Sequence, residues 1–401
     1  MMLRDSLSGI RVLDFSHVVA GPVCGMLLGD MGADVCKIEP LDGELGRTIG
    51  PPWQNGESVV ALSVNRSKRG LAVDLRHEAG RAAVRRMALQ ADILVESFRP
   101  GVMRKFGLDA PSLQGANPRL VYCSISAYGQ SGPGRDKPGV DGVIQAVAGL
   151  MATLGEENGS PAKVGIPIAD MATGYLATVA TLSALHKARE TGRGQHLDMS
   201  LFNATVMLQH LGMAFHFATG LEPAKLGSAA PYAAPNEAFP TADGWIMVAA
   251  YQPARWNRLC ELLGLEDLSR DARFADNEAR VGNRTALHAV LDPVFQRFST
   301  RHWLDRLSAG DILCAPIASY AQVRASAEYQ AGGIEIETEH PVAGTVRMPG
   351  LAFGDATTLP YRAAPTPGQH SAEILAEYGI DAEDIRALQA CGAIRGPSIN
   401  P

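Results

Sequence analysis

Residues 10–40, IRVLDFSHVVAGPVCGMLLGDMGADVCKIEP, decide the fold of this chain. They contain an apolar run over 10–15, a helical segment over 20–33 that ends near Gly32, and a second apolar run over 34–40. A strand, a helix and another strand in this order are typical of a βαβ unit. The stretch therefore predicts a mostly parallel sheet with helices on both faces, and ligands near the carboxyl ends of its strands.

The same pattern repeats along the chain, with strands expected at 71–75, 92–98 and 120–126 and a helix at 78–90. Around Gly220 the sequence becomes rich in Pro, Ala and Gly, and a hairpin is expected at Asp243 and Gly244. Amphipathic helices follow over 255–326, one of them capped at Ser299 or Thr300, and short strands resume after Val342. We therefore expect a large α/β domain over 1–220, a small domain over 221–341 and a return to the large domain over 342–401.

Composition excludes several classes of protein. The 401 residues are 46% apolar and 19% charged, as in ordinary globular proteins. The net charge of −6 argues against broad attraction to nucleic acid or to an anionic membrane. The six cysteines form no CxxC pair, which favours a reducing cytoplasm over a disulfide scaffold or a zinc site. The first residues do not resemble a secretory signal, and the apolar stretch 168–185 is too polar for a membrane span.

The segments after the expected strands contain candidate binding residues. The turn 16–22 lacks the GxGxxG pattern of nicotinamide and flavin enzymes, yet it starts a helix whose N-terminus could hold a phosphate. A simple small-residue turn explains it equally well. The basic cluster 65–70, and the group Arg99, Arg104 and Lys105, are either solvated loops or phosphate contacts.

Asp170 follows an apolar run, 165–169, that we read as a strand. A helix with an apolar stripe of Leu176, Val179, Leu182 and Leu185 begins there and is expected to stop at Gly192. Asp170 is either the N-cap of this helix or an exposed carboxylate whose pKa the helix terminus lowers, so that it can act as a nucleophile. The ten histidines show no metal-ligand spacing, so no metal site is expected.

An ordered series of segments resembles the family III CoA-transferases, which include formyl-CoA transferase, the carnitine CoA-transferases and α-methylacyl-CoA racemase. The resemblance runs nearly end to end. It is carried by GIRVLDFSHVVAGP, GDMGADVCKIEP, NRSKRGLAVDL, DILVESFRPGVMRKFGLD, NPRLVYCSISAYGQSGP, IADMATG, TGRGQHLDMSL and PGQHSAEIL.

The resemblance implies a Rossmann-like large domain built from both ends of the chain, a smaller inserted domain, and two subunits interlocked as a homodimer. It implies that Asp170 attacks an acyl-CoA thioester, so that CoA passes to a carboxylic acid through an aspartyl anhydride and an aspartyl-CoA thioester. No permanently bound cofactor is needed, because coenzyme A enters as a thioester substrate. Family precedent suggests succinyl-CoA as the donor and a small dicarboxylate such as succinate, malate, mesaconate or itaconate as the acceptor.

The resemblance also implies the residues that contact CoA. His17, Val18 and Ala20 would line the nucleotide and pantetheine, Lys68 and Lys105 would lie near the phosphates, and Phe98 would pack on the adenine side. This chain departs from formyl-CoA transferase at Val19 and Pro40, where that enzyme has Gln and Arg, and it lacks the glycine-rich active-site loop. These departures leave formyl-CoA and oxalate specificity open.

Two alternatives to a CoA-transferase remain at this stage. An acyl-CoA racemase would carry a Gly-His-Asp triplet with a basic histidine, whereas this chain has Gly139, Val140 and Asp141. A CoA-binding protein without turnover is the second alternative, and it would exchange no CoA between an acyl-CoA and an acid.

Overall fold

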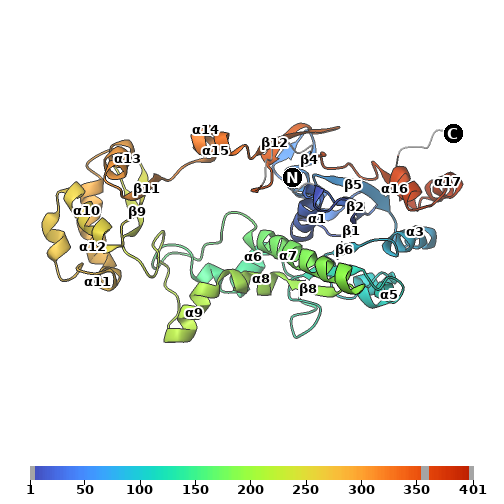
Figure 1. The fold of residues 1–401 in the computed structure, drawn as a ribbon, viewed down its shortest axis with the longest axis horizontal. Coiled ribbons are helices and arrows are strands. Elements are labelled where there is room, and N and C mark those ends of the chain that lie inside the picture. The colour runs from blue at the N-terminus through green and yellow to red at the C-terminus, as the bar shows by residue number, and fades with distance from the viewer. Residues whose placement is uncertain (1–4, 354–360, 397–401) are drawn as a thin grey trace. The chain divides into compact units, whose positions relative to one another are not determined.

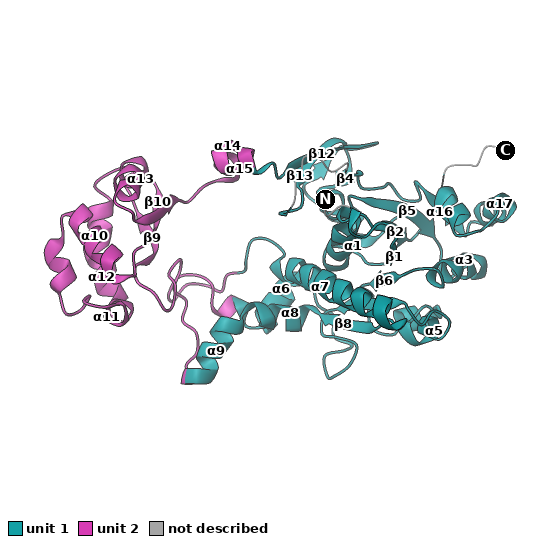
Figure 2. Cartoon of the chain, in the orientation of Figure 1, with its two compact units in different colours: residues 1–150, 163–218, 332–401 teal, residues 151–162, 219–331 magenta. Residues whose placement is uncertain are grey.

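The computed structural model describes residues 5–353 and 361–396. These residues form two compact units, each with its own core (Figure 2). Unit 1 contains 1–150, 163–218 and 332–401, and unit 2 contains 151–162 and 219–331. The divisions at 218/219 and 331/332 lie near the expected boundaries at 220 and 341, and residues 151–162 join unit 2 although they were expected in the large domain.

Unit 1 is built on a seven-stranded sheet with the order β14-β5-β2-β1-β6-β7-β8 (Figure 1). All neighbouring strands are parallel except β14, which pairs antiparallel with β5 at one edge. The expected α/β class and the parallel sheet are thereby confirmed. The strands are β1 (Arg11–Asp14), β2 (Asp34–Glu39), β5 (Lys68–Val73), β6 (Ile93–Glu96), β7 (Val121–Ser126), β8 (His196–Ser200) and β14 (Ile394–Arg395).

Helices cover both faces of this sheet because side chains alternate along each buried strand. Leu13 faces a core shared with α3, α5, α16 and α17, whereas its neighbour Val12 faces a core shared with α1, α6, α7 and α8. The helices of this part are α1 (Ala20–Asp30), α2 (Val59–Val64), α3 (Glu78–Ala88), α4 (Val102–Lys105), α5 (Ala110–Gln114), α6 (Asp141–Val147), α7 (Ile168–Thr191), α8 (Leu201–Leu208), α9 (His210–Thr219), α16 (Ser371–Glu377) and α17 (Ala382–Ala390).

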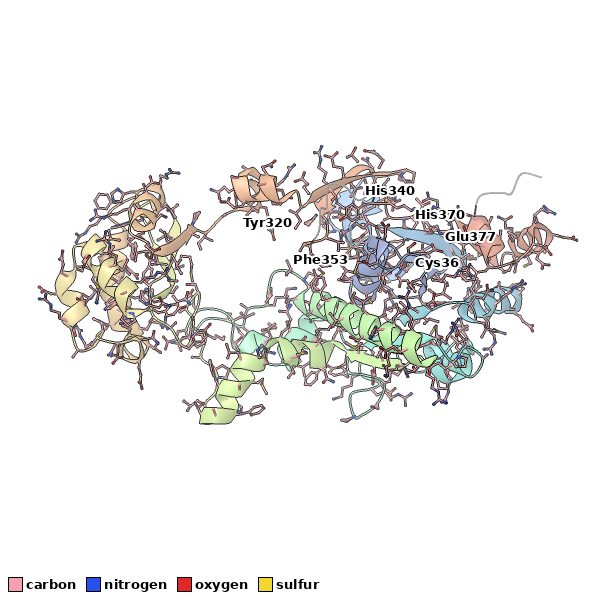
Figure 3. All side chains as sticks on the ribbon, viewed as in Figure 1. Cys36, Tyr320, His340, Phe353, His370 and Glu377 are labelled. Atoms are coloured by element: carbon pink, nitrogen blue, oxygen red, sulfur yellow. The ribbon has the colours of Figure 1, made fainter. Side chains whose placement is uncertain are left out.

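The C-terminal segment completes the sheet begun by the N-terminal part. His370 and Glu377 of this segment lie at the sheet, on the same side of the view as Cys36 of β2 (Figure 3). The Gly70 amide donates to Nδ1 of His370 over 3.1 Å, and Arg69 Nη2 lies 2.6 Å from Oε2 of Glu377. Unit 1 also contains two small hairpins. One pairs β3 (Trp53–Gln54) with β4 (Glu57–Ser58), and the other pairs β12 (Glu335–His340) with β13 (Gly344–Pro349).

Unit 2 has a three-stranded antiparallel sheet, β11-β10-β9, packed against helices around Trp256, Phe295 and Trp303. The hairpin expected at Asp243 and Gly244 joins β9 to β10, and Ser299 caps α13 as expected by accepting from the His302 amide. The elements are β9 (Asn236–Pro240), β10 (Trp245–Ala249), β11 (Leu313–Pro316), α10 (Pro253–Leu263), α11 (Asn277–Gly282), α12 (Arg284–Phe295), α13 (Thr300–Ala309), α14 (Tyr320–Ala325) and α15 (Ala327–Gly332).

Helix α7 differs from its expected form. Residues 165–167 form no strand, and the buried face of α7 consists mainly of small residues such as Ala177, Thr178 and Thr181. Of the expected stripe, Leu185 is buried whereas Val179 is exposed. The helix does end at Gly192, which has a left-handed backbone with φ of 71°. Its length and apolar composition would suit a membrane span, but half of its most apolar window is buried inside the protein. We therefore assign α7 as a core helix.

Small residues let α7 approach α1 closely. A Cβ atom on Gly174 would lie 2.6 Å from the carbonyl oxygen of Ala20 and 2.8 Å from Cβ of Val23. Real Cβ contacts are not this short, because interiors are packed at the density of organic crystals. Any side chain at this position must therefore push the two helices apart.

We predict that Gly174→Ala lowers the free energy of unfolding by about 1–3 kcal/mol, the usual cost of overpacking a core. Gly282→Ala is the matched control, because a Cβ atom there meets nothing within 4 Å and the residue also lies in a helix. Urea unfolding followed by circular dichroism measures both. Equal stability of the two variants would contradict the role given to Gly174.

Candidate active site

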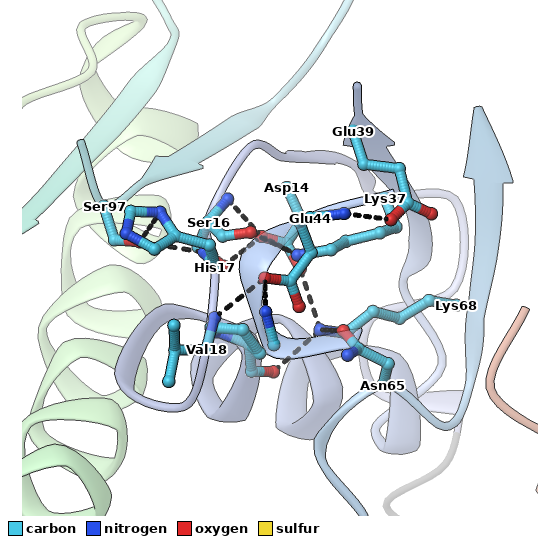
Figure 4. A network of polar contacts seen from close by, with 12 residues as sticks. Asp14, Ser16, His17, Val18, Lys37, Glu39, Glu44, Asn65, Lys68 and Ser97 are labelled. Atoms are coloured by element: carbon cyan, nitrogen blue, oxygen red, sulfur yellow. Dashed lines mark hydrogen bonds and ion pairs between the residues drawn. The ribbon is translucent and has the colours of Figure 1, made fainter. Parts of the chain in front are cut away.

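The loop between β1 and α1 lies at the carboxyl end of the central strand. The His17 amide donates to Oγ of Ser97 over 2.9 Å, and the Val18 amide donates to Oε2 of Glu44 over 3.1 Å (Figure 4). Val18 has φ of 66°, a left-handed conformation that β-branched residues rarely adopt. Such backbone strain costs about 1–3 kcal/mol and is concentrated at functional sites. The Glu44 contact helps hold the loop in this conformation.

A fully buried group of charges contacts the loop (Figure 4). Lys68 Nζ lies 2.8 Å from Oδ2 of Asp14 and also donates to the Pro22 carbonyl and to Oδ1 of Asn65, each over 2.8 Å. Lys37 donates to the Ser16 carbonyl. Burial opposes ionisation of Asp14, but the two lysines outweigh it and lower its pKa. The network therefore joins β1, β2 and β5 directly to the loop that holds His17.

This geometry corrects the expected role of Lys68. Its side chain is inaccessible to solvent, and all three of its donors are used inside the protein. Burial, opposed by Asp14, lowers the pKa of Lys68 to about 8. The residue cannot contact a phosphate in this conformation, so we assign it to support of the loop.

The rest of the basic cluster 65–70 is also structural. Arg66 Nη2 lies 2.7 Å from Oδ2 of the buried Asp30, and Arg69 binds Asp34, Glu373 and Glu377. Strand β5 starts at Lys68, three residues before its expected start, so Arg69 belongs to the sheet and not to a loop. The sequence could not reveal this, because most of their partners lie more than thirty residues away along the chain.

Asp170 lies in the first turn of α7 but does not cap it. The N-cap is Pro167, which has no side-chain hydrogen bond to the helix. Asp141 takes that role, because its Oδ1 accepts from the amides of Ala169 over 2.8 Å and of Asp170 over 3.5 Å. Gln145 Nε2 holds the other oxygen of Asp141 at 2.7 Å. Asp170 is therefore not the N-cap, which was one of its two expected roles, and its carboxylate makes no capping bond.

Electrostatics at Asp170 also differ from expectation. Burial and the negative charge of Asp141 raise the pKa of Asp170 to about 7. A helix N-terminus favours the ionised form, but here desolvation is the larger effect. Asp170 is therefore a half-buried carboxyl group that titrates near neutral pH, a property common among catalytic acids and nucleophiles.

The contact between α1 and α7 brings Asp170 toward the β1–α1 loop. Met171 packs in one apolar cluster with Val18, Val19 and Val23. Ala20, the first residue of α1, is buried in the core, and its carbonyl approaches Gly174. The fold therefore brings Val18 and Ala20 to the first two turns of α7, which contain Asp170.

A cavity of about 490 Å³ opens at the carboxyl ends of β1, β2, β5 and β6. Phe98, Val102 and Phe106 line it together with Pro40, and the His17 ring lies 5.6 Å from the Phe98 ring. Arg76, which the sequence analysis did not single out, also lines the cavity. Lys105 is exposed on the short helix α4, which supplies Val102 to the cavity wall. Its apolar lining and size suit a flat aromatic group such as a nucleotide base.

Comparison with known proteins finds relatives that match nearly the whole chain. The chain is 37% identical over 386 residues to a succinate–glutarate CoA-transferase of Agrobacterium fabrum, covering 93% of this chain and 96% of that protein. It is 36% identical to the human succinyl-CoA:glutarate CoA-transferase, covering 92% and 85%. The crystal structure of a CAIB/BAIF family protein from Brucella suis superposes with a TM-score of 0.82 at 36% identity, covering 93% and 99%.

The family model described as CoA-transferase family III matches residues 7–371, which include the β1–α1 loop, Asp141 and Asp170. The resemblance found in the sequence is confirmed over nearly the whole chain. The protein belongs to CoA-transferase family III and is a CoA-transferase.

Proposed function

We propose that this protein moves CoA from succinyl-CoA to a small dicarboxylic acid through covalent intermediates on Asp170. The observation that carries the proposal is the placement of the Asp170 carboxyl group. It is half-buried in the first turn of α7 beside the β1–α1 loop, and it makes no capping bond, because Asp141 accepts from the helix amides. A carboxylate held in this way can attack an acyl carbon.

The reaction then proceeds in four balanced steps. The Asp170 carboxylate attacks the thioester carbon, and the carbon–sulfur bond breaks to give a mixed anhydride and CoA thiolate. The thiolate attacks the Asp170 acyl carbon, which releases succinate and leaves an aspartyl-CoA thioester. The acceptor carboxylate attacks this thioester, forming a second anhydride and freeing the thiolate. The thiolate finally attacks the acceptor's acyl carbon, so that the Asp170 carboxylate is regenerated.

The surroundings of Asp170 suit these steps. Each attack places negative charge on an oxygen near the N-terminal end of the 24-residue helix α7, whose dipole stabilises anions. No step transfers a proton to or from carbon. Val140, at the N-cap of α6, carries no group that could do so, which favours transfer over racemisation.

The CoA moiety fits the cavity of about 490 Å³ at the strand ends. We place its adenine against Phe98 and its phosphates toward Lys105, with His17 and Val18 along the path to Asp170. The side chain of Ala20 is buried, so we assign this residue only the role of starting α1 beside this path. Arg76 at the cavity wall is an additional candidate for the phosphates.

The acceptor proposed is a five-carbon dicarboxylate such as glutarate. The relatives from Agrobacterium fabrum and from human, both named for glutarate, support this choice. Malate, mesaconate and itaconate are the acids to compare with it. We place the reaction in the cytoplasm, because all six cysteines are free thiols and four of them are buried.

We also propose a homodimer. Helix α9 has no buried residue, and large apolar side chains are exposed on α6, α7, α8 and α9. Val179 is 61% exposed and Phe217 is 76% exposed. Exposed apolar side chains gathered on successive helices favour an interface, and a second copy of the chain is the partner that an interlocked family topology supplies.

We predict that Asp170→Asn folds normally but loses CoA exchange by at least about a thousandfold, because an amide cannot form the anhydride. Succinyl-CoA with glutarate and the other acids measures exchange, and a thermal melt measures folding. Glu190→Gln, an exposed change at the other end of α7, is the matched control. After incubation with succinyl-CoA, hydroxylamine should attack the activated acyl group of Asp170 in the wild-type protein and modify the peptide that contains it. Near wild-type exchange in the Asp170→Asn variant would contradict the covalent mechanism.

We predict that exchange rises with pH through about 7 as Asp170 ionises, and that Asp141→Asn moves this rise to lower pH. Removing the Asp141 charge favours the ionised form of Asp170 and so lowers its pKa, while the Asn oxygen can still accept from Ala169. Asp136→Asn, in the exposed loop before α6, is the control and should leave the pH profile in place. A profile unchanged by Asp141→Asn contradicts the assigned electrostatic role.

We predict that light scattering finds a particle of twice the chain mass of 42.5 kDa. Val179→Asp and Phe217→Asp should shift it toward the monomer, because each would bury an unpaired charge. Arg301→Glu, an exposed change in unit 2, should leave the mass unaltered. A wild-type monomer that is stable and active would overturn the dimer proposal.

A further inference from the structure

A second cavity, of about 270 Å³, lies over β6, β7 and β8 beside α4 and α5. Its lining is polar and charged, unlike the apolar lining proposed for CoA. Buried side chains from the strands contribute Glu96, Ser124 and Tyr122, and three exposed arginines contribute the positive charge. The arginines are Arg99, Arg104 and Arg135.

The buried Glu96 and Ser124 form a connected polar group with His196, which is exposed. Ser124 Oγ lies 2.9 Å from Nε2 of His196 and also binds Glu96, whose Oε2 accepts from the Phe98 amide over 2.9 Å. Burial raises the pKa of Glu96 to about 7, so its carboxyl group is partly protonated at neutral pH. Burial lowers the pKa of His196. The buried wall therefore offers hydrogen bonds and only a partial negative charge.

Two of the arginines have no acidic partner. In residues 5–353 and 361–396, no carboxylate forms an ion pair with Arg99 or Arg135, whereas Arg104 Nε lies 3.8 Å from Oδ2 of Asp109. Arginine guanidinium groups bind carboxylates and phosphates through paired hydrogen bonds. Two unpaired guanidinium groups on one cavity predict an anionic ligand.

This cavity is separate from the one proposed for CoA. The two share no lining residue, and helix α4 stands between them, with Val102 on one side and Met103 and Arg104 on the other. The volume of about 270 Å³ is too small for CoA but large enough for a small molecule with one or two anionic groups.

We propose that this second cavity is a binding site for a small dianion, either phosphate or a dicarboxylate, held by Arg99 and Arg135. Arg99 follows β6, and Arg135 belongs to the segment between β7 and α6, so a bound dianion joins two loops across the cavity. The segment that carries Arg135 leads directly to Asp141, which caps α7 at Ala169. A dianion bound to Arg135 therefore restrains the segment between β7 and α6, and it leaves the proposed active site around Asp170 unoccupied.

The test is calorimetric titration of inorganic phosphate into the wild-type protein, with and without saturating CoA. We expect saturable binding in both conditions. The double variant Arg99→Ala/Arg135→Ala should bind phosphate at least about tenfold more weakly, because two charge-assisted contacts are lost. Arg258→Ala, an exposed arginine in unit 2, is the matched control for charge alone and should bind as the wild type does. Glutarate titrated into the phosphate complex distinguishes the two sources, since a dicarboxylate that uses this site displaces phosphate.

Three results would overturn the proposal. No saturable phosphate binding removes the site, and equal weakening by Arg258→Ala reduces it to nonspecific charge. Loss of phosphate binding on addition of CoA would place the phosphate in the CoA cavity. Thermal melts of each variant exclude unfolding as the cause, and the substituted arginines are exposed. None of these results depends on whether Asp170 is the nucleophile.

Discussion

Helices α1 and α7 pack backbone against backbone because Gly174 has no side chain to separate them. The position of Asp170 depends on this contact. Asp170 lies one turn before Gly174, so the close approach brings its end of α7 to the loop that holds His17 and Val18. A larger residue at this point would move the carboxyl group away from the strand ends where the substrate is proposed to bind. The packing of α1 against α7 thus sets the distance between the Asp170 carboxyl group and the proposed substrate.

Buried charge is the second constraint on the site. Asp14, Lys37 and Lys68 lie inside the sheet, where isolated charges would be very costly, and each is satisfied by its partners or by backbone carbonyls. Breaking one contact would leave an unpaired charge in the core. We infer that this network holds the strained loop at Val18, since Lys37 donates to the carbonyl of Ser16 two residues before it.

The sequence left two alternative roles open for Asp170, N-cap or nucleophile; Asp141 takes the capping role, and the nucleophilic role is the one we propose for Asp170. Asp141 accepts hydrogen bonds from the first amides of α7, so the Asp170 carboxylate is not needed to cap the helix. The negative charge of Asp141 also raises the pKa of Asp170. Asp141 therefore both satisfies the first amides of α7 and changes the acidity of Asp170. Two acids with different environments are a frequent basis for assigning catalytic roles.

The sequence alone determined the βαβ order, the sheet class, the hairpin at Asp243, the stop at Gly192 and the family, because these follow from local periodicity, turn residues and ordered motifs. It did not reveal that Lys68 is buried, that α7 packs through small residues, or that Asp141 is the cap. Lys68 reaches Asp14 across 54 positions, and Asp141 reaches Ala169 across 28. Contacts this distant depend on which strands and helices become neighbours, and the same residue types suit a solvated loop or a buried pair. Only tertiary packing, through desolvation and close approach, decided between them.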